Sequence, residues 1–355
     1  MAAAVRVGVL NDMADPGAGL GGAPEDMTEW LEREVDSARA AGRITAPVEF
    51  VHAYGLGLPS GTAEAIEKAY QDLVDQDVVL IVGPGIGDNA LIATPLAERL
   101  RVPTINWAGA ERARGKYMFH LQVGSYDDES LVIARHLCGL GARRLGVVHD
   151  VSASGTRHLR TLQDEATILG IEIVAAHGLS PLTDNTAEEV ASVLAAAPDA
   201  FVYLGVGSAA VPVAESLSAS GWRGPRMMNT AGCSQRGDSA KLCEGWSYVD
   251  MYSDGNHTLT ALRATLNIPD GGILTAAKGH DLGRLVAEAI ARARDISREG
   301  LRLGLEQVRW LPAAEGEEGT LLGFGLQDRG ALHGRYLVVR QWQGGRSVEV
   351  SAHTS

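Results

Sequence analysis

No part of the sequence approaches the roughly 18 consecutive apolar residues that a membrane-spanning helix needs, so we expect no direct insertion into a membrane. Basic residues are also few, since 31 Lys and Arg stand against 44 Asp and Glu and the formal net charge is −13. They are scattered and form no basic stripe. The sequence therefore excludes nucleic acid and anionic membranes as expected partners, and the acidity serves solubility.

Cysteine is scarce, and its three residues do not define a metal centre. Cys138 lies in an apolar helical pattern, where we expect a buried thiol. Cys233 and Cys243 stand in a loop-rich segment, and the sequence leaves open whether they form a disulfide or remain free thiols. No spacing of Cys and His resembles a zinc site, so no metal is expected.

Signatures of catalysis and of nucleotide binding are absent as well. The Gly-rich GPGIGD at 83–88 does not have G-x-G-x-x-G spacing, so we expect no nucleotide and no other cofactor. Neither GSAA at 207–210 nor GCS at 232–234 has the form of a nucleophile elbow. His149 and Asp150 end a predicted strand, where a catalytic dyad is the alternative to a structural role. The sequence therefore favours a binding protein over an enzyme.

The chain is organised around residues 78–109. This segment reads as a short apolar strand at 78–82, a Gly-rich loop, an amphipathic helix at 90–100 and a second strand. A strand, a helix and a strand within about thirty residues form a βαβ unit, which requires a parallel sheet. Ligands bind beyond the carboxyl ends of such strands. The loops at 83–89 and 106–110 are therefore expected to lie side by side and to begin a pocket.

The rest of the chain repeats this alternation in two halves. The first half, up to residue 107, reads strand, helix, strand, helix, strand, helix, strand. A similar order begins at residue 117 and continues to residue 229, without repeating the sequence of the first half. Such alternation predicts doubly wound α/β lobes with parallel sheets, and 355 residues suffice for two domains.

The last third of the chain holds too few elements for a third lobe. Helices are predicted at 276–294 and 298–308, and strands at 246–252 and 336–342. We expect these pieces to complete the two lobes, so that the chain crosses between them three times. The expected lobes are residues 1–121 with 252–327 and residues 122–251 with 328–355, and the expected crossings lie near 121–125, 248–252 and 327–334.

Several segments stand in an order and spacing typical of one family: VRVGVLNDM, LIVGPGIGDNALIATPLAERLRVPTINWAGA, RRLGVVHDVSASG, PDAFVYLGVGSAA, EGWSYVDMYSDGN, GHDLGRLVAEAIARA and GTLLGFGLQDRGALHGRYLVVRQW. The whole chain resembles the type I periplasmic-binding fold, specifically the branched-chain amino acid (leucine/isoleucine/valine) binding proteins of ABC transporters. The GVLNDM start and the DRGALHGRYLVV segment are more similar to the aromatic- and organic-acid-binding branches. The resemblance implies two doubly wound parallel-sheet lobes joined by a three-strand hinge, with a ligand cleft that closes between them.

The loops depart from the family's amino acid binders at three positions. Those proteins hold the α-carboxylate and ammonium with a serine, a threonine and an acid, and the matching positions here are Gly87, Ala110 and Ala231. A buried ammonium without a carboxylate partner is costly. The resemblance therefore implies a ligand other than a free amino acid.

The expected cleft is apolar, and its polar groups are sparse. Gly85, Gly87, Gly109 and Gly207 are expected to leave backbone N–H groups free for a carboxylate or carbonyl oxygen. This chemistry favours an apolar or aromatic carboxylic acid, an amide or a lipid-derived acid. The expected ligand-binding residues are Asn11, Asp12, Gly85, Ile86, Gly87, Asp88, Asn106, Trp107, Ala108, Gly109, Ser152, Ser154, Val206, Gly207, Asn229, Met251, Tyr252 and His280.

Structural roles are the alternatives for some of these side chains. Trp107 would otherwise pack the interface between the lobes, and Asp12 would cap a turn. His280 is expected in the pocket wall, beside Asp281 as the cap of the predicted helix.

The leading functional hypothesis is a solute-binding protein that delivers a small apolar or aromatic acid to the membrane permease of an ABC transporter. The resemblance implies a periplasmic or cell-surface location, but the sequence begins MAAAV without a signal peptide and would act in the cytoplasm if Met1 is the native start. A cytoplasmic ligand sensor on the same fold, similar to the amide sensors, is the first alternative. A branched-chain amino acid binder and an enzyme on this fold are the others.

Overall fold

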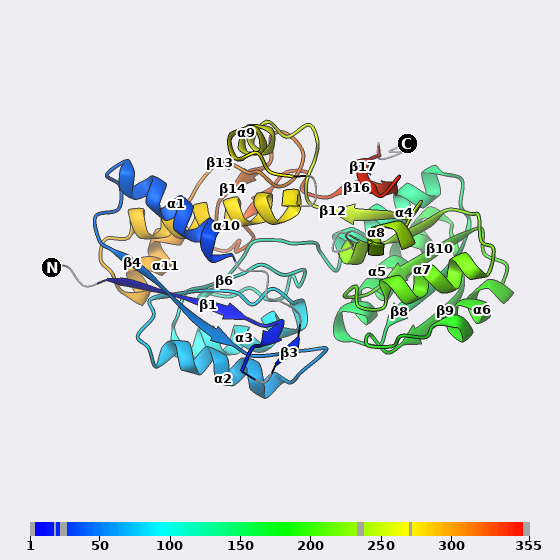
Figure 1. Cartoon of the computed structure of the whole chain (residues 1–355), viewed down its shortest axis with the longest axis horizontal. Helices are drawn as coiled ribbons and strands as arrows, with labels where there is room; N and C mark the ends of the chain where they lie inside the picture. Colours follow the sequence, from blue (N-terminus) through cyan, green and yellow to red (C-terminus); the bar gives the residue numbers. More distant parts are fainter. Residues whose placement is uncertain (1–3, 18, 22–26, 233–237, 270–271, 351–355) are drawn as a thin grey trace. The chain divides into compact units, whose positions relative to one another are not determined.

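The computed structural model describes residues 4–17, 19–21, 27–232, 238–269 and 272–350 (Figure 1). Its contacts divide the chain into unit 1, Met1–Val123 with Asp254–Tyr336, and unit 2, Gly124–Ser253 with Leu337–Ser355. The sequence predicts the third crossing near 327–334, whereas the structure keeps the chain in unit 1 up to Tyr336. The reason is strand pairing, because Gly330 forms a parallel bridge with His120 of unit 1.

Unit 1 is built on a five-stranded parallel sheet in the order β4-β1-β5-β6-β7. The strand order reverses between β1 and β5, which places a topological switch point at the carboxyl ends of these two strands. The strands are β1 (Val5–Asn11), β4 (Val48–Tyr54), β5 (Leu80–Val82), β6 (Thr104–Asn106) and β7 (Met118–His120).

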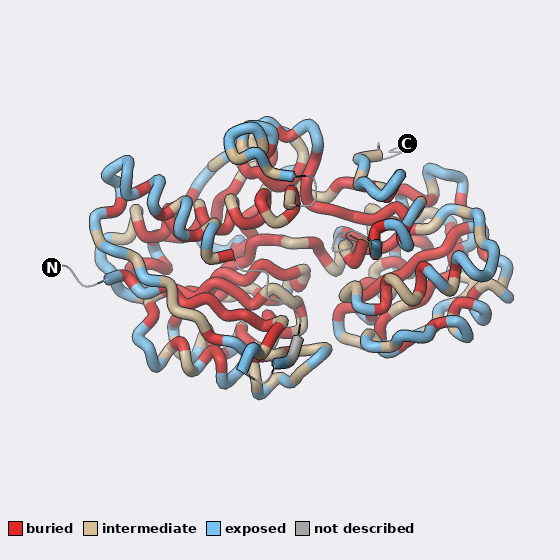
Figure 2. Tube along the Cα trace, in the orientation of Figure 1, coloured by how far each residue is buried: buried red, intermediate tan, exposed pale blue. Residues whose placement is uncertain are grey.

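Helices cover both faces of this sheet because its strands are apolar on both sides. Leu80 and Val82 pack in one core and Ile81 in the other, as the two-residue period of a strand requires. The first core holds α1 (Thr28–Ala40), α10 (Ile273–Arg292) and α11 (Arg298–Glu306), and the second holds α2 (Ala63–Val74) and α3 (Gly87–Leu100). The inner strands β5 and β6 are buried along their whole length, whereas the edge strand β4 is mostly half-buried or exposed (Figure 2).

Smaller elements complete unit 1, and the sequence predicts none of them. Most are two-residue strands, too short to show a period, and the one helix among them buries only Leu259 fully. They are β2 (Ala14–Asp15), β3 (Leu20–Gly21), α9 (His257–Leu266), β13 (Leu311–Pro312), β14 (Leu321–Leu322) and β15 (Leu332–His333).

Unit 2 has a seven-stranded sheet in the order β17-β16-β12-β11-β10-β8-β9. Five neighbouring strands of this sheet, β9, β8, β10, β11 and β12, are parallel and repeat the strand order of unit 1. A second switch point therefore lies between β8 and β10. The last two strands are antiparallel and joined by Gly344 and Gly345, which both have positive φ. The strands are β8 (Arg144–Asp150), β9 (Glu172–Leu179), β10 (Ala200–Leu204), β11 (Arg226–Met228), β12 (Ser247–Asp250), β16 (Val338–Gln343) and β17 (Arg346–Glu349).

Two cores flank the sheet of unit 2 in the same way. Val147 and Val202 face one core, and Val148 and Phe201 face the other. The first core holds α4 (Asp128–Gly139) and α5 (Ala153–Leu169), the second holds α6 (Ala187–Ala195), α7 (Ala210–Ala219) and α8 (Asp238–Leu242), and a short 3-10 helix η1 spans Thr230–Gly232.

Within the described residues, no helix is both long and apolar enough to span a bilayer. Cys138 is half-buried, and Cys243 is a buried free thiol whose pKa burial raises to about 12. Cys233, its proposed disulfide partner, lies outside the described residues.

We predict that Leu305→Ala on α11 lowers the free energy of unfolding by about 2–5 kcal/mol, because Leu305 is fully buried in the core beneath the unit 1 sheet. Leu303→Ala on the same helix is the matched control, since Leu303 is 39% exposed and its truncation should cost about 0.5 kcal/mol or less. Urea unfolding followed by circular dichroism measures both. Equal losses in the two variants would contradict the assignment of the buried face.

Candidate functional site

A buried carboxylate organises the switch point of unit 1. Asp12 follows β1 and is 1% exposed, and its two oxygens accept hydrogen bonds from the backbone N–H groups of Gly85 and Ile86, each at 2.9 Å. Asn89 donates a third hydrogen bond to the carboxylate, also at 2.9 Å. Burial raises the pKa of Asp12, and these three donors partly oppose that rise. Asp12 thereby holds the Gly-rich loop after β5 against the end of β1.

This arrangement corrects one expectation about the loop. The sequence predicts that Gly85 leaves its N–H free for a ligand oxygen, but the structure gives that N–H to Asp12. The side chain of Asn11 is also engaged inside the unit, because its amide group lies within hydrogen-bond distance of the Val9 and Ala53 carbonyl oxygens. The Asp12 carboxylate and the Asn11 amide nitrogen therefore build the edge of the sheet.

Trp107 packs directly on the loop that Asp12 holds. A Cβ at Gly85 would lie 2.5 Å from the Trp107 ring, so only glycine allows this contact. The Lys278 ammonium group lies over the same ring, 4.3 Å from its centroid. Both side chains are largely buried, at 8% and 3% exposure. An aromatic ring and a cation are thus fixed together beside the Gly-rich loop.

Lys278 is not among the expected ligand-binding residues, although the sequence places it near the expected cleft and carries a signal for it. Lys278 precedes Leu282 by four residues and Leu285 by seven, so it lies on the apolar stripe of α10. A lysine on a buried stripe is unusual and indicates a specific partner.

Asn106 and His120 close the next loop of unit 1. Asn106 donates from its amide group to the carbonyl oxygens of Ala113 and Phe119, at 2.8 and 2.9 Å. His120 accepts from Arg114 at Nδ1, so its Nε2 carries the proton and donates to the Ala108 carbonyl oxygen. Burial lowers the pKa of His120 to about 3, with Arg114 adding to the effect, and the ring stays neutral.

Three further expected residues lie at helices of unit 1. Gly87 and Asp88 form the start of α3, where Gly87 is buried and Asp88 is half-buried. His280 lies within α10, and its Nδ1 is 2.8 Å from a carboxylate oxygen of Glu34 on α1. His280 therefore joins two helices.

Asp281 is not the cap of its helix, as the sequence predicts, because α10 begins at Ile273. Its carboxylate instead accepts hydrogen bonds from the backbone N–H groups of Ala314 and Glu315, at 2.8 and 3.0 Å. Burial raises the pKa of Asp281 to about 6, while His280 and the two amides oppose this shift. Asp281 thus holds the 314–315 segment as Asp12 holds the Gly-rich loop.

The switch point of unit 2 has the same device. Asp150 ends β8, is fully buried, and accepts hydrogen bonds from the Tyr203 hydroxyl at 2.9 Å and from the Val206 backbone N–H at 2.8 Å. Burial and the charge of Asp150 raise the pKa of Tyr203, so the hydroxyl remains a donor. The backbone N–H groups of Gly207 and Ala209 oppose part of this rise in the pKa. Asp150 therefore anchors the loop after β10, and the Nδ1 of its neighbour His149 lies 3.1 Å from the Asp150 carbonyl oxygen.

Asn229 and Glu129 fix the loop after β11. The Asn229 amide accepts from the Gly205 N–H at 3.2 Å and donates to the Gly205 carbonyl oxygen at 2.9 Å. Glu129, which the sequence does not single out, accepts from the backbone N–H groups of Ser125 and Thr230, both at 2.6 Å. No local pattern distinguishes Glu129 from any acid in the first turn of a helix.

The remaining expected residues of unit 2 also have contacts within their own unit. Ser152 caps α5 by accepting from the Gly155 N–H at 3.0 Å, and its hydroxyl contacts that of Ser154. Met251 is fully buried. Tyr252 is 5% exposed, with the Arg340 guanidinium 4.0 Å from its ring centroid.

At the carboxyl edges of both sheets, some of the expected residues stabilise the fold and others remain half-exposed. The Asp12 carboxylate, the Asn229 amide and the amide NH2 groups of Asn11 and Asn106 serve the fold. The expected residues that stay half-exposed are Gly85, Ile86, Asp88, Gly109, Ser152, Val206, Gly207 and His280.

Enclosed space at the unit 1 edge is small. A cavity of about 10 Å³ lies between the ends of β1 and β5, among Asn11, Met27, Val82 and Trp107. It has room for about one water-sized group. Within the described residues, His, Cys, Asp and Glu do not gather in groups of three that could hold a metal ion.

A family model described as periplasmic binding protein matches residues 4–345. No curated protein matches the chain in sequence. Solved structures match its fold over nearly the whole length. The leucine binding protein LivK from Thermotoga maritima MSB8 has a TM-score of 0.79 and 15% identity, with 98% of each chain covered.

Two other similar structures hold bound ligands. The ABC transporter substrate-binding protein from Desulfitobacterium hafniense, in complex with Leu, has a TM-score of 0.77 and 17% identity, covering 98% of this chain and 100% of that chain. A solute binding protein of an ABC transporter from R. palustris, in complex with benzoate, has a TM-score of 0.77 and 15% identity, covering 99% of this chain and 97% of that chain. These likenesses confirm the two-lobed α/β fold predicted from the sequence.

We predict that Asp12→Asn destabilises the protein by about 1–3 kcal/mol, because the asparagine NH2 group would face one of the three N–H donors and leave it unsatisfied. Asp164→Asn is the matched control, since Asp164 is exposed. Urea unfolding measures both variants, and an Asp12→Asn protein as stable as the control would show that the loop does not depend on this carboxylate.

We also predict a pH-dependent contribution from Asp281. Between pH 3.8 and about 6 the folded carboxyl keeps a proton that the unfolded chain has released, so this group makes the free energy of unfolding fall as pH rises through that window. Asp281→Asn removes the contribution, and the variant should gain stability relative to the wild type from pH 3.8 to about 6. Urea unfolding across that range tests it. A constant difference between the two proteins would contradict it.

Proposed function

Because the chain belongs to the periplasmic binding protein family, we propose that it binds a small apolar or aromatic organic acid and presents it to the permease of an ABC transporter. It binds its ligand without turnover. It acts outside the cytoplasm, where solute-binding proteins meet their permeases. A lipid-derived acid is the larger form of the same ligand class.

The observation that carries this proposal is the pairing of Trp107 with Lys278 beside the Gly-rich loop. An aromatic face recognises a flat apolar group, and a fixed ammonium group attracts a carboxylate. Asp12 at the end of β1 does not oppose the binding of a ligand carboxylate, because its own carboxylate accepts hydrogen bonds from the loop amides of Gly85 and Ile86. The unit 1 edge therefore favours an anion over a zwitterion with its own ammonium group.

The half-exposed residues at the carboxyl edges of the two sheets favour a ligand with an apolar group. Ile86 and Val206 stand half-exposed on the two loops held by Asp12 and Asp150, next to glycines that add no polar side chain. Burial of apolar surface contributes about 25 cal/mol per Å² to binding, before the costs of association. We propose the half-exposed residues of each edge as the ligand-contacting set, with Asn11, Asp12, Asn106 and Asn229 as positioning residues.

The ligands of two similar structures illustrate the two competing hypotheses, an organic acid and a free amino acid. Leucine, bound by the D. hafniense protein, and benzoate, bound by the R. palustris protein, both carry a carboxylate, but only leucine carries an ammonium group. Positions Gly87, Ala110 and Ala231 offer no side-chain partner for that ammonium group. We therefore place this chain's preference with the benzoate type of ligand.

We predict that benzoate or a larger aryl carboxylate raises the thermal unfolding midpoint and that leucine does not. A ligand at a hundred times its dissociation constant adds about 2.7 kcal/mol to the free energy of unfolding, which a thermal shift detects readily. The matching primary amide, benzamide, should stabilise less because it has no charge to meet Lys278. Stabilisation by leucine or valine alone would overturn the proposed ligand class and favour a branched-chain amino acid binder.

A matched pair of variants tests the role of the Lys278 ammonium group. Lys278→Met should weaken aryl carboxylate binding by about tenfold or more, since a charge-assisted contact contributes about 1.5–3 kcal/mol. Lys116→Met is the control, because Lys116 also lies over an aromatic ring of unit 1, that of Tyr117, but is exposed. Isothermal titration calorimetry gives both dissociation constants. Equal affinities in the two variants would remove Lys278 from the site.

A further inference from the structure

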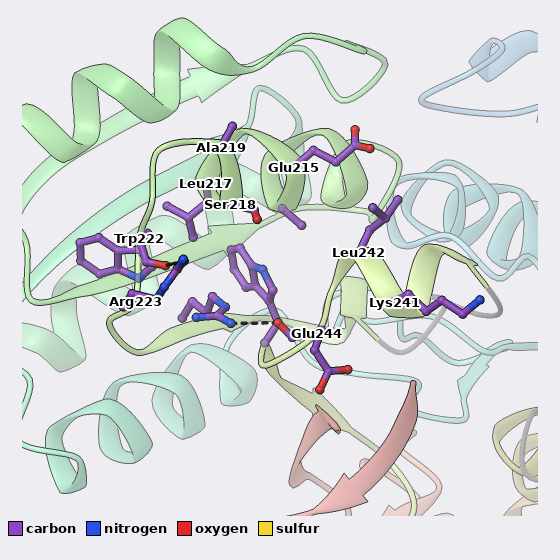
Figure 3. Close-up of a pocket in the computed structure, with 12 residues that line it drawn as sticks. Glu215, Leu217, Ser218, Ala219, Trp222, Arg223, Lys241, Leu242 and Glu244 are labelled. Atoms are coloured by element: carbon purple, nitrogen blue, oxygen red, sulfur yellow. Dashed lines mark hydrogen bonds between the residues drawn. The ribbon is translucent and has the colours of Figure 1, made fainter. Parts of the chain in front are cut away.

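Unit 2 contains a second cavity, far along the sheet from the loops just described. It has a volume of about 420 Å³, within the roughly 300–1,000 Å³ range of small-molecule sites. Its walls are the last turns of α7, the segment that leads into β11, and the end of α8 (Figure 3). Arg226, the first residue of β11, lines it, so the cavity lies at the amino edge of the sheet. The loops held by Asp150 and Asn229 are at the opposite, carboxyl edge.

One end of this cavity is cationic. Arg226 donates to the Glu244 and Gly224 carbonyl oxygens, at 2.9 and 3.4 Å, and Arg223 donates to the Trp222 carbonyl oxygen at 3.0 Å. Within the described residues, the hydrogen bonds of these guanidinium groups go to backbone oxygens and not to carboxylates. Burial lowers the pKa of Arg226, and the charge of Arg223 lowers it further. Two like charges therefore share this end.

The acids around the cavity offset that charge only in part, because the Glu244 charge opposes the lowering of the Arg226 pKa. The Glu244 carboxylate accepts hydrogen bonds from the backbone N–H groups of Gly344 and Gly345, at 2.8 and 3.2 Å. Figure 3 shows the carboxylate of Glu215 directed away from Arg223. Lys241, which also lines the cavity, forms an ion pair with Asp238 at 2.8 Å.

The rest of the cavity is aromatic and apolar. Leu217 and Trp246 are buried and form part of the wall. Trp222 lies at the same end as Arg223 (Figure 3), and its indole Nε1 is buried without a hydrogen-bond acceptor among the described residues. A buried donor without an acceptor is costly, and an oxygen atom of a ligand would satisfy it.

We propose that this cavity is a second binding site, which takes a planar organic anion of the aryl carboxylate class. The ring of the ligand packs against Trp222 and Trp246, and its carboxylate accepts from the guanidinium groups of Arg223 and Arg226. The site does not depend on the ligand proposed at the carboxyl edges, because it shares no residue with them. It offers the protein a place to sense an aromatic acid independently of transport.

Fluorine NMR of the full chain labelled with fluorotryptophan tests this, with naphthoate as the probe. The six tryptophans give separate reporters, and Trp222→Phe and Trp107→Phe assign the signals of the two regions. Naphthoate should shift the Trp222 signal with saturation. Arg223→Gln and Arg226→Gln should each weaken that binding by about tenfold or more. Arg223 is exposed, so its variant should keep the wild-type fold.

Two controls make the result specific. Lys241 lines the same cavity, but its charge is already paired with Asp238. The Lys241→Gln variant should therefore bind naphthoate as the wild type does. Naphthamide, which has the same ring without the charge, should bind much more weakly. Failure of naphthoate to shift Trp222, equal binding of the amide, or equal binding by the arginine variants would each overturn the second site. A shift of Trp107 alone would do so while leaving the proposed function intact.

Discussion

A buried carboxylate that binds backbone N–H groups is the interaction on which both sheets of this protein depend. Asp12 in unit 1 and Asp150 in unit 2 each end the first strand of a sheet and hold the loop that follows the neighbouring strand. Such a carboxylate is costly to bury, and its hydrogen bonds to amides offset the cost only in one loop geometry. The two units thus use one device at the same topological position, although their sequences differ.

This device decides what the loops can offer to a ligand. The Asp12 and Asp150 carboxylates bind loop amides within their own units, and the half-exposed positions beside them are mainly glycine and aliphatic residues. Charge is then supplied from a different element, the Lys278 ammonium group of α10 beside Trp107. A rigid polar framework under an apolar surface suits the function that we propose, because it orders the loops before any ligand arrives and lowers the entropy cost of binding.

The sequence predicts the alternation of strands and helices well, because the cores on both faces impose clear periods on strands such as β5. It also places Asp12 and Trp107 at the carboxyl ends of strands. It does not predict their contacts, since the hydrogen bond between Asp12 and Ile86 spans 74 residues and the pair of His280 with Glu34 spans 246. Long-range pairing of this kind leaves no local pattern. The cavity at Trp222 cannot be predicted from the sequence either, because it arises where three elements meet.

The chain returns to each unit after leaving it, and this has a consequence for the order of synthesis. In unit 1, the face of the sheet that carries Val5, Val7 and Val9 is covered in part by α10 and α11, which begin only at Ile273. In unit 2, β12 finds its antiparallel neighbour only when Val338 and the residues after it exist. Neither unit can therefore finish folding as the ribosome releases its first segment. Two incomplete sheets with exposed apolar faces must coexist until the chain is nearly complete, which makes the growing polypeptide a natural client for chaperones.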